Sequence, residues 1–564
     1  MLYNYDLIIA SFTYLKNRIN ILYIFTILSF SSRINKIMAR KNWTILIIGL
    51  IFFLSFLLRS YHFSDWLYLA NDEARDAIEA CKIVRGNFSD FPLLGPKLGG
   101  TNAQLGPAYY YLLAIPGIIF QNCEPQTFAY VSLFFSLLAI PLLYFTLHQF
   151  FNNYISISVT LIFAFSYVFT QYSRFAWNPN TLPFWSLAFA LSIYKTFSEN
   201  NKKKASLYLL LAAFIYGIIG QLHILSLMGF PLIAASFWFF YRPKINWKYW
   251  IGSALIVFTL YSPLIIYDVK NNGKNFQAFL TGINKNNVDI QSKNNFLKPY
   301  IKISNESGRF FALIISSVNN KELPSVEYIS LGLILISFYL ASKYCLKIKQ
   351  NLTKSKKAYI CLFLFWFVVY FILYAQLANS LNQVRFWFIV VPPFFFLLAF
   401  IFYEIQKIRI LGNVMIVSIT VILLLLNLSA IEKWYSSMEA KKEVNRPFRI
   451  WTSRSFKFDD LITVGEMKNI VKVIDSETIR DDSQSINFNF EQRYAGAFQY
   501  IYHIYSSKKY NINYVEKIDN ADNKPGAFIY IISSDNSDFR KNQNGVNFEK
   551  IYNSGILSLW KNIN

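Results

Sequence analysis

Long apolar runs separated by short polar segments dominate the chain between residues 43 and 430. A membrane-spanning helix needs about 20 mostly apolar residues. The pattern predicts eleven such spans, which lie at 43–58, 127–147, 155–173, 181–197, 206–222, 223–241, 249–267, 327–342, 358–378, 386–404 and 409–429. The sequence therefore predicts an all-α polytopic membrane protein.

Basic residues gather in five polar segments beside these spans, at 33–41, 195–204, 242–248, 343–357 and 404–409. With eleven spans, all five segments fall on one side of the membrane. Cytoplasmic loops carry an excess of Lys and Arg, so that side is the cytoplasm. We therefore expect a multi-pass protein of the cell (inner or plasma) membrane, with its N-terminus in the cytoplasm and its C-terminus outside.

Three longer regions then lie outside the cell, at 59–126, 268–326 and 431–564. The last of these has the polar composition of a soluble domain and alternates helix-like and strand-like runs. The helix-like runs are Gly465–Ser476 and Ala495–Ser507, and the strand-like runs are Ser485–Phe490, Ala527–Ser533 and Gly555–Trp560. This alternation predicts a small extracytoplasmic α/β domain after a transmembrane domain at 38–430.

Residues 1–37 fit this organisation poorly, because Lys16, Asn17 and Arg18 interrupt their apolar stretch. Met38 directly precedes the first span and resembles a natural start. Residues 1–37 are therefore either a mis-assigned extension or an additional span.

Composition agrees with a membrane protein, since 54% of residues are hydrophobic and only 15% are charged. Soluble domains carry about 25% charged residues. The net charge of +23 could indicate nucleic acid, but the Lys-rich segment 343–357 is explained by orientation, so we expect no nucleic-acid partner. The four His are too scattered to predict a metal site, and we expect neither a metal nor a cofactor. Cys81 and Cys123 both lie outside and could form a disulfide, although nothing in the sequence fixes their distance.

The first external region contains a charged segment at 71–82. On a helical projection, Ala74, Ala77, Ile78, Cys81 and Val84 share one face. The opposite face carries Asp72, Arg75, Asp76, Glu79 and Lys82. This pattern predicts an amphipathic helix lying on the outer membrane surface.

Two interpretations of the charged face remain open. It could be a solvated face tied by pairs three residues apart, such as Asp72–Arg75 and Glu79–Lys82. It could instead be a catalytic face, in which Asp72 removes a proton from an acceptor and Arg75 binds a phosphate.

A series of short motifs favours the catalytic interpretation. In chain order they are Asp72-Glu73-x-Arg75, Gly-Pro-x-Tyr-Tyr-Tyr-Leu at 106–112, Ser-Arg-Phe-Ala-Trp-Asn-Pro-Asn at 173–180, Gln-Leu-His at 221–223, Tyr-Ser-Pro at 261–263 with Tyr267-Asp268, and Arg-Phe-Trp at 385–387 before Pro392-Pro393. In this order, over residues 43–430, the chain resembles the family-39-type membrane glycosyltransferases, which include protein O-mannosyltransferases and lipid A aminoarabinose transferases. The resemblance implies a GT-C fold and a polyprenyl-phosphate sugar donor.

The resemblance also implies roles for individual residues. Asp72 is the expected base, Glu73 a supporting carboxylate and Arg75 a donor-phosphate ligand. Many relatives have Lys-Pro where this chain has Gly106-Pro107, and that Lys contacts the donor phosphate. Lys97 could substitute for it.

Six further residues are candidates for the substrate or phosphate site, and three of them, Arg174, His223 and Asp268, also have a structural interpretation. Arg174 either extends to the interface beside aromatic residues or lines the substrate pocket with Asn178 and Tyr109. His223 is either a satisfied buried histidine or a pocket residue. Asp268 either caps the seventh span or contacts a metal or the acceptor. Because an intramembrane cation is costly unless it is functional or paired, we expect Arg385 to bind phosphate.

The sequence thus predicts an inverting glycosyltransferase that uses a polyprenyl-phosphate sugar and an acceptor glycan, lipid or protein outside the cell. The alternative is a transporter or lipid flippase. That class predicts charges near the membrane midplane and paired broken helices in two related halves, and the sequence shows neither.

Overall fold

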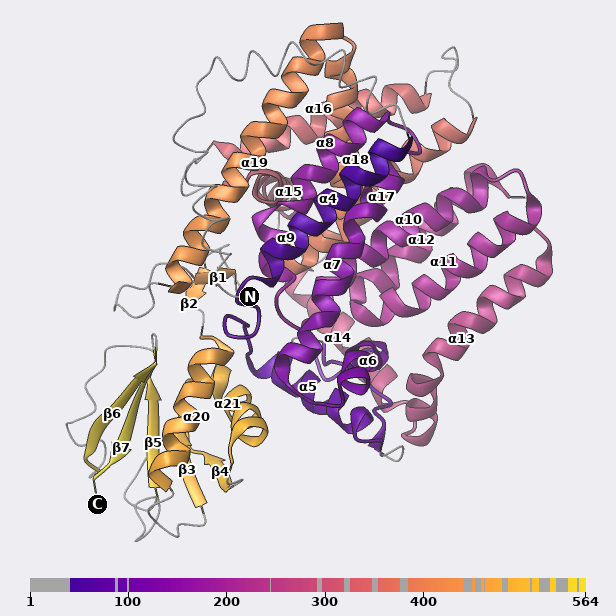
Figure 1. The fold of residues 1–564 in the computed structure, drawn as a ribbon. Helices are drawn as coiled ribbons and strands as arrows, with labels where there is room; N and C mark the ends of the chain where they lie inside the picture. Colours follow the sequence, from indigo (N-terminus) through magenta and orange to yellow (C-terminus); the bar gives the residue numbers. More distant parts are fainter. Residues whose placement is uncertain are drawn as a thin grey trace.

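A computed structural model describes most of the chain from residue 41 to residue 563 (Figure 1). The gaps in this range are 87–89, 99–100, 244, 292–296, 319–324, 347–353, 376–383, 440–448, 452–457, 461, 479–484, 508–509, 517–527, 534–545 and 555–556. The predicted extension at 1–37, most of the basic segment 33–41 and the middle of the basic segment 343–357 lie outside the described residues.

Every predicted span coincides with helical structure. The helices are α4 (Lys41–Ser60), α7 (Pro125–Leu147), α8 (Asn153–Ala164), α9 (Tyr167–Tyr172), α10 (Leu182–Ser198), α11 (Lys202–Leu222), α12 (Ile224–Tyr241), α13 (Trp247–Lys270), α16 (Val326–Leu346), α17 (Lys354–Ala375), the 3-10 helix η3 (Val384–Val390) continued by α18 (Val391–Gln406), and α19 (Arg409–Glu439). Within the described residues, eight helical segments are long and apolar enough to cross a membrane. The other three predicted spans, at α8–α9, α10 and α12, form shorter helices. The chain is a multi-pass membrane protein.

The third predicted span, 155–173, is two helices rather than one. The helix is interrupted between α8 and α9. Polar groups at this interruption form hydrogen bonds with neighbouring helices. The Ser166 hydroxyl donates to the Ile314 carbonyl at 2.8 Å, and the Tyr167 N–H donates to Oδ1 of Asn427 at 2.9 Å. Backbone groups at membrane depth must be satisfied within the protein, so Asn427 of α19 stabilises the break.

The predicted external region 268–326 is partly core. It forms α14 (Lys274–Gln291) and α15 (Lys298–Ser316). The second half of α15 is buried, with Phe310, Phe311 and Ile314 each at 0% exposure, and it packs among α9, α16, α17 and α19. This half of α15 was expected in an external loop, and that expectation is wrong because its apolar face inserts into the bundle.

The C-terminal region is an α/β domain, as predicted. Its sheet has the order β4-β3-β5-β7-β6, with β3 (Ser485–Asn489), β4 (Asn511–Tyr514), β5 (Phe528–Ser533), β6 (Phe548–Ser554) and β7 (Leu557–Asn562). The pairs β3–β4 and β3–β5 are parallel, and the pairs β5–β7 and β6–β7 are antiparallel. A short hairpin, β1 (Arg449–Trp451) and β2 (Phe458–Asp460), precedes the domain.

Two helices of this domain, α20 (Val464–Thr478) and α21 (Gln492–Tyr505), lie between the sheet and the helix bundle (Figure 1). The start of α20 is joined to the chain after α4, because the Val464 N–H donates to the Leu67 carbonyl at 2.9 Å and the Gly465 N–H to the Asp65 carbonyl at 3.0 Å. Helix α21 packs on α5 (Asn71–Val84), which lies beside α6 (Ala108–Phe120) at the same end of the bundle.

Candidate active site

Helix α5 carries the charged segment that the sequence singled out. The helix starts after Ala70, whose extended backbone leaves its N–H free to donate to the Glu73 carboxylate at 3.0 Å. This contact is half of a capping box. Acidic residues in the first turn are also favoured by the helix dipole, so the local sequence explains why the helix begins here and holds Asp72 in its first turn.

Arg75 links the carboxylates on either side of it. Its Nη1 donates to Oδ1 of Asp72 at 2.9 Å, and its Nε and Nη2 donate to Oδ1 of Asp76 at 3.0 and 2.8 Å. The predicted pairs Asp72–Arg75 and Glu79–Lys82 are both present. Because the guanidinium lies between Asp72 and Asp76, it offsets their mutual repulsion.

Three carboxylates in the first two turns of α5 have different environments. The side chain of Asp72 is 57% exposed, whereas Glu73 and Asp76 are buried. Burial, with the Asp72 charge nearby, raises the pKa of Glu73 to about 8. Burial also raises the pKa of Asp76 to about 7, although Arg75 opposes this shift. A fully solvated charged face was one of the two interpretations left open by the sequence, and the burial of Asp76 does not fit it.

Most of the apolar face of α5 is covered by protein. Ala74, Ala77 and Cys81 are at most 5% exposed, while Ile78 is 44% exposed. The helix packs against α6 on one side and α21 on another. These neighbours cover most of the apolar face, and the position of α5 on the membrane surface stays a prediction.

Arg385 approaches the same carboxylates from η3. Asp72 and Glu73 are within electrostatic range of its guanidinium, which lies 5.0 Å from the ring centres of Trp177 and Phe386. Its Nε is buried without a hydrogen-bond partner among the described residues. The Arg385 guanidinium is therefore the second in the site. Among the described residues, it forms no direct ion pair with a carboxylate.

Two predicted pocket residues flank this arginine. The ring of His223, at the junction of α11 and α12, lies 5.4 Å from that of Phe386. The Asn178 side chain donates to the Leu222 carbonyl at 2.5 Å and so ties the Trp177–Asn178 turn to the same junction. His223 also accepts the Leu225 N–H through Nδ1, which gives this buried histidine a capping role.

A cavity of about 430 Å³ opens beside Arg75. It is lined by Arg75, Glu79, Pro92, Leu93, Leu94, Gly95, Lys97, Gln104, Tyr110 and Tyr267. Lys97 and Arg75, both predicted phosphate ligands, thus face one space. The exposed Lys97 lies on a hairpin-like loop that pairs with Gln104, and Asn275 holds Gln104 through two backbone hydrogen bonds of 2.8 and 3.1 Å.

Gly106 lies close against the side chain of Gln221. A Cβ atom on Gly106 would lie 2.1 Å from Oε1 of Gln221. That oxygen accepts the Ala108 N–H at 3.2 Å, and Nε2 of Gln221 donates to the Leu260 carbonyl at 2.9 Å. Gln221 therefore joins three segments at a point where a side chain on residue 106 would require the Gln221 amide to move.

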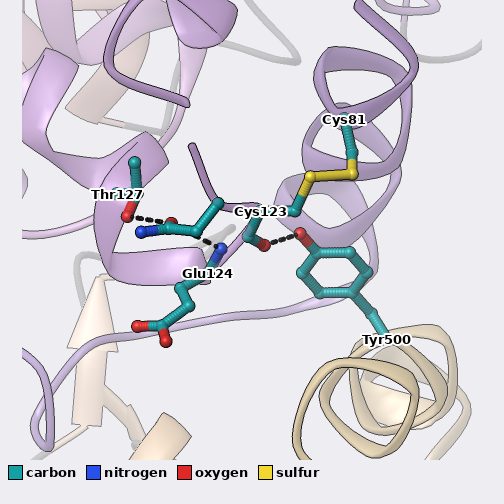
Figure 2. The surroundings of a disulfide bond; sticks show 6 residues. Cys81, Cys123, Glu124, Thr127 and Tyr500 are labelled. Carbon is teal, nitrogen blue, oxygen red and sulfur yellow. Dashed lines mark hydrogen bonds between the residues drawn. A yellow bond between two sulfur atoms is a disulfide. The ribbon is translucent and has the colours of Figure 1, made fainter. Parts of the chain in front are cut away.

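A disulfide fixes the far end of α5. Cys81 is bonded to Cys123, which lies between α6 and α7, with the Cα atoms 5.6 Å apart. Figure 2 shows the hydroxyl of Tyr500, from α21, directed at the Cys123 carbonyl, to which it donates a hydrogen bond. The pairing that the sequence left open is therefore present, together with a second disulfide, Cys345–Cys361, that the sequence did not indicate.

Comparisons with known proteins show the fold. No protein-family model matches the sequence, and no curated protein matches it. Among solved structures, ArnT from Cupriavidus metallidurans bound to undecaprenyl phosphate is similar over 93% of this chain and 99% of its own, with a TM-score of 0.53 and 10% identity. The oligosaccharyltransferase AglB from Archaeoglobus fulgidus, in complex with an inhibitory peptide and a dolichol-phosphate, covers 83% of this chain and 64% of its own, with a TM-score of 0.45 and 13% identity. This chain has a GT-C fold.

Within the GT-C fold, Arg174 lies apart from the cavity. It is 2% exposed, and its Nη1 and Nη2 donate to the carbonyls of Arg59 and His62 at 2.7 and 3.0 Å. Its guanidinium also lies 5.7 Å from the ring centre of Trp434. A cation is favoured at a helix C-terminus, so these contacts cap α4.

Tyr109 and Asp268 also have structural contacts in this GT-C fold. Tyr109 is fully buried, and the charges of Asp76 and Glu73 lie close to its hydroxyl. Oδ1 of Asp268 accepts the Asn275 N–H at 2.8 Å, which caps the start of α14 rather than the end of the seventh span. Among the described residues, no group of three or more His, Cys, Asp or Glu could hold a metal ion.

Sequence reasoning missed several residues of the site. Gln221 and Trp177 belong to quoted motifs but had no role assigned. Tyr110 and Tyr267 line the cavity, and their only signal was their place in those motifs. Asn71 directly precedes Asp72, and nothing in the sequence connected it to α21.

Proposed function

We propose that this protein is a glycosyltransferase that moves a sugar from a polyprenyl-phosphate donor to an acceptor outside the cell. The observation that carries the proposal is the convergence of Asp72 and Arg75 from α5 with Arg385 from η3, far apart in sequence. The GT-C fold supports the proposal, but a fold alone does not specify a reaction. ArnT, which has the same fold, was crystallised with undecaprenyl phosphate.

Asp72 is the proposed base because of its environment. A general base must reach the proton it removes, and Asp72 is the exposed carboxylate of the three. Glu73 is buried and accepts the Ala70 N–H, while Asp76 is buried against Arg75. Glu73 therefore acts as a supporting carboxylate that fixes the first turn of α5.

The proposed reaction is a single displacement with inversion. Asp72 takes the proton from an acceptor hydroxyl or amine, and the freed electron pair forms a bond to the anomeric carbon of the sugar. The bond between that carbon and the phosphate oxygen breaks, and polyprenyl phosphate leaves with the bonding electrons.

Three cations serve the leaving phosphate in this proposal. Arg75 and Lys97 line the cavity, and Arg385 lies on the side of Asp72 and Glu73. Guanidinium groups bind phosphate oxygens in pairs, and fixed positive charge stabilises the negative charge that develops on the leaving group. The polyprenyl chain lies along the aromatic-rich helices within the bilayer.

The test is a transfer assay with purified protein and a labelled polyprenyl-phosphate sugar. Removing a catalytic base lowers the rate by about 100-fold to 10,000-fold, so Asp72→Asn is expected to lose at least 100-fold in kcat while still binding polyprenyl phosphate. Retention of wild-type turnover in Asp72→Asn refutes the assigned base.

Asp65→Asn is the matched control for this assay. Asp65 is an exposed carboxylate seven positions earlier, and within the described residues its side chain accepts a hydrogen bond from the Ser64 hydroxyl. Its turnover is expected to equal that of the wild-type protein. If neither the wild type nor the control releases polyprenyl phosphate from any such donor, the proposed reaction itself is wrong.

A further inference from the structure

Helix α21 of the C-terminal domain lies against α5 along its length. At the start of α5 it contacts Asn71, and near the end of α5 its residue Tyr500 binds the carbonyl of Cys123, the disulfide partner of Cys81. Both ends of the helix that carries Asp72 are therefore attached, directly or through a disulfide, to one helix of another domain.

The contact at Asn71 is made by the side-chain amide. Its Nδ2 donates to the Gln492 carbonyl at 2.6 Å, and its Oδ1 accepts the N–H groups of Gly496 at 2.8 Å and Ala497 at 3.3 Å. Gln492 and Gly496 are four residues apart, and their carbonyl and N–H are the pair that an α-helix joins directly. The amide of Asn71 thus bridges groups of the α21 backbone itself.

Gly496 makes room for this contact. A Cβ atom at residue 496 would lie 3.0 Å from Oδ1 of Asn71, so a larger residue would displace the amide by a few tenths of an ångström. Glycine is unfavourable inside helices relative to alanine. Its presence in α21 is explained by the close approach of Asn71.

A second contact fixes the chain that leads into α5. Nη2 of Arg493 donates to the hydroxyl of Tyr68 at 2.7 Å, and Tyr68 is buried and pairs with Thr463. The residues on the N-terminal side of Asp72 are thus held by the C-terminal domain, and those on its C-terminal side continue into the helix.

We propose that α21 positions the base Asp72 through Asn71, which makes Asn71 and Gly496 positioning residues of the active site. This inference rests on the proposed function, in which Asp72 is the base. Misplacement of a reacting group by about 1 Å can cost 100-fold in rate, so loss of this contact lowers kcat more than it weakens donor binding.

The experiment is a double-mutant cycle with Asn71→Ala and Gly496→Ala in the full-length protein. We expect Asn71→Ala to lower kcat at least about tenfold and to leave the KM for the donor within about twofold. Gly496→Ala is expected to lower kcat in the wild-type background. It is expected to have no further effect in the Asn71→Ala background, because both changes disrupt the same contact between Asn71 and α21. Asn469→Ala is the matched control, since its amide contacts Ser554 inside the C-terminal domain.

Amide hydrogen exchange of α5 is the second measurement, and it does not depend on turnover. Residues 71–76 are expected to exchange faster in Asn71→Ala than in the wild type and the Asn469→Ala control. Unchanged exchange overturns the proposed attachment, and faster exchange with unchanged kcat overturns its link to catalysis. Failure of the proposed function gives a different result, since either the wild-type protein would show no turnover or Asp72→Asn would retain it.

Discussion

At the scale of single residues, neighbouring carboxylates of α5 differ because the protein covers them differently. Asp72 faces solvent, whereas Glu73 and Asp76 are buried and their pKa values are raised to about 8 and about 7. Environment can push apart the pKa values of adjacent acids and so divide their roles. Asp72 is left as the accessible carboxylate beside two guanidinium groups.

Lys97→Ala is expected to weaken donor binding. Lys97 is exposed, so its contact with a phosphate is partly screened by water and salt, and a loss of about threefold to tenfold in affinity is expected from about 1 kcal/mol. The measurement is a titration of the purified protein with polyprenyl phosphate at low ionic strength. Lys433→Ala, at an exposed lysine of α19, is the control, and unchanged affinity in Lys97→Ala would exclude a phosphate contact.

The sequence identified residues more readily than it identified their surroundings. Asp72, Arg75 and Arg385 were predicted from charge and motif, and the structure brings them together. The burial of Asp76 was missed, because a helical projection separates polar from apolar positions but contains no information about which neighbours cover each face. That covering comes from segments far away in the chain.

At the scale of elements, hydrophobicity predicted where helices occur and missed where they break. The run 155–173 is apolar throughout, so nothing in it indicated the break between α8 and α9. The break depends on Asn427, which is more than 250 positions away. Helix α15 was missed for a related reason, since its polar first half masked an apolar second half that enters the bundle.

Breaking the Cys81–Cys123 disulfide is expected to destabilise the protein. The two residues are 42 positions apart, and closing a loop of that length removes about 4 kcal/mol of chain entropy from the unfolded state. The measurement is thermal unfolding of the purified protein in detergent. Cys81→Ala and Cys123→Ala are expected to lower the melting temperature equally, and the double variant no further; unchanged melting in both single variants would contradict this prediction.

At the scale of the whole molecule, α5 and the C-terminal domain occupy the same end of the bundle (Figure 1). Ten predicted spans separate them in sequence, and an even number of crossings returns the chain to the side it left. The contact between α5 and α21 therefore agrees with the predicted arrangement, in which the basic segments gather at the opposite side.

Orientation is tested with a membrane-impermeant thiol reagent on intact cells. Cys345 and Cys361, which form the second disulfide, are first replaced by Ser so that neither sulfur can react with the reagent. Lys472→Cys, exposed on α20, is expected to be labelled from outside, and Lys204→Cys, exposed at the start of α11, only after permeabilisation. The reverse pattern would invert the assignment.

The contact between Asn71 and Gln492 joins positions 421 residues apart. Protein synthesis proceeds from the N-terminus, so α5 is synthesised early. Its contact with α21 forms only after nearly the whole chain has been made. A nascent or truncated chain that already contains every membrane helix lacks this attachment. Biosynthesis therefore completes the proposed active site last, and the proposed transfer activity is expected only of finished chains.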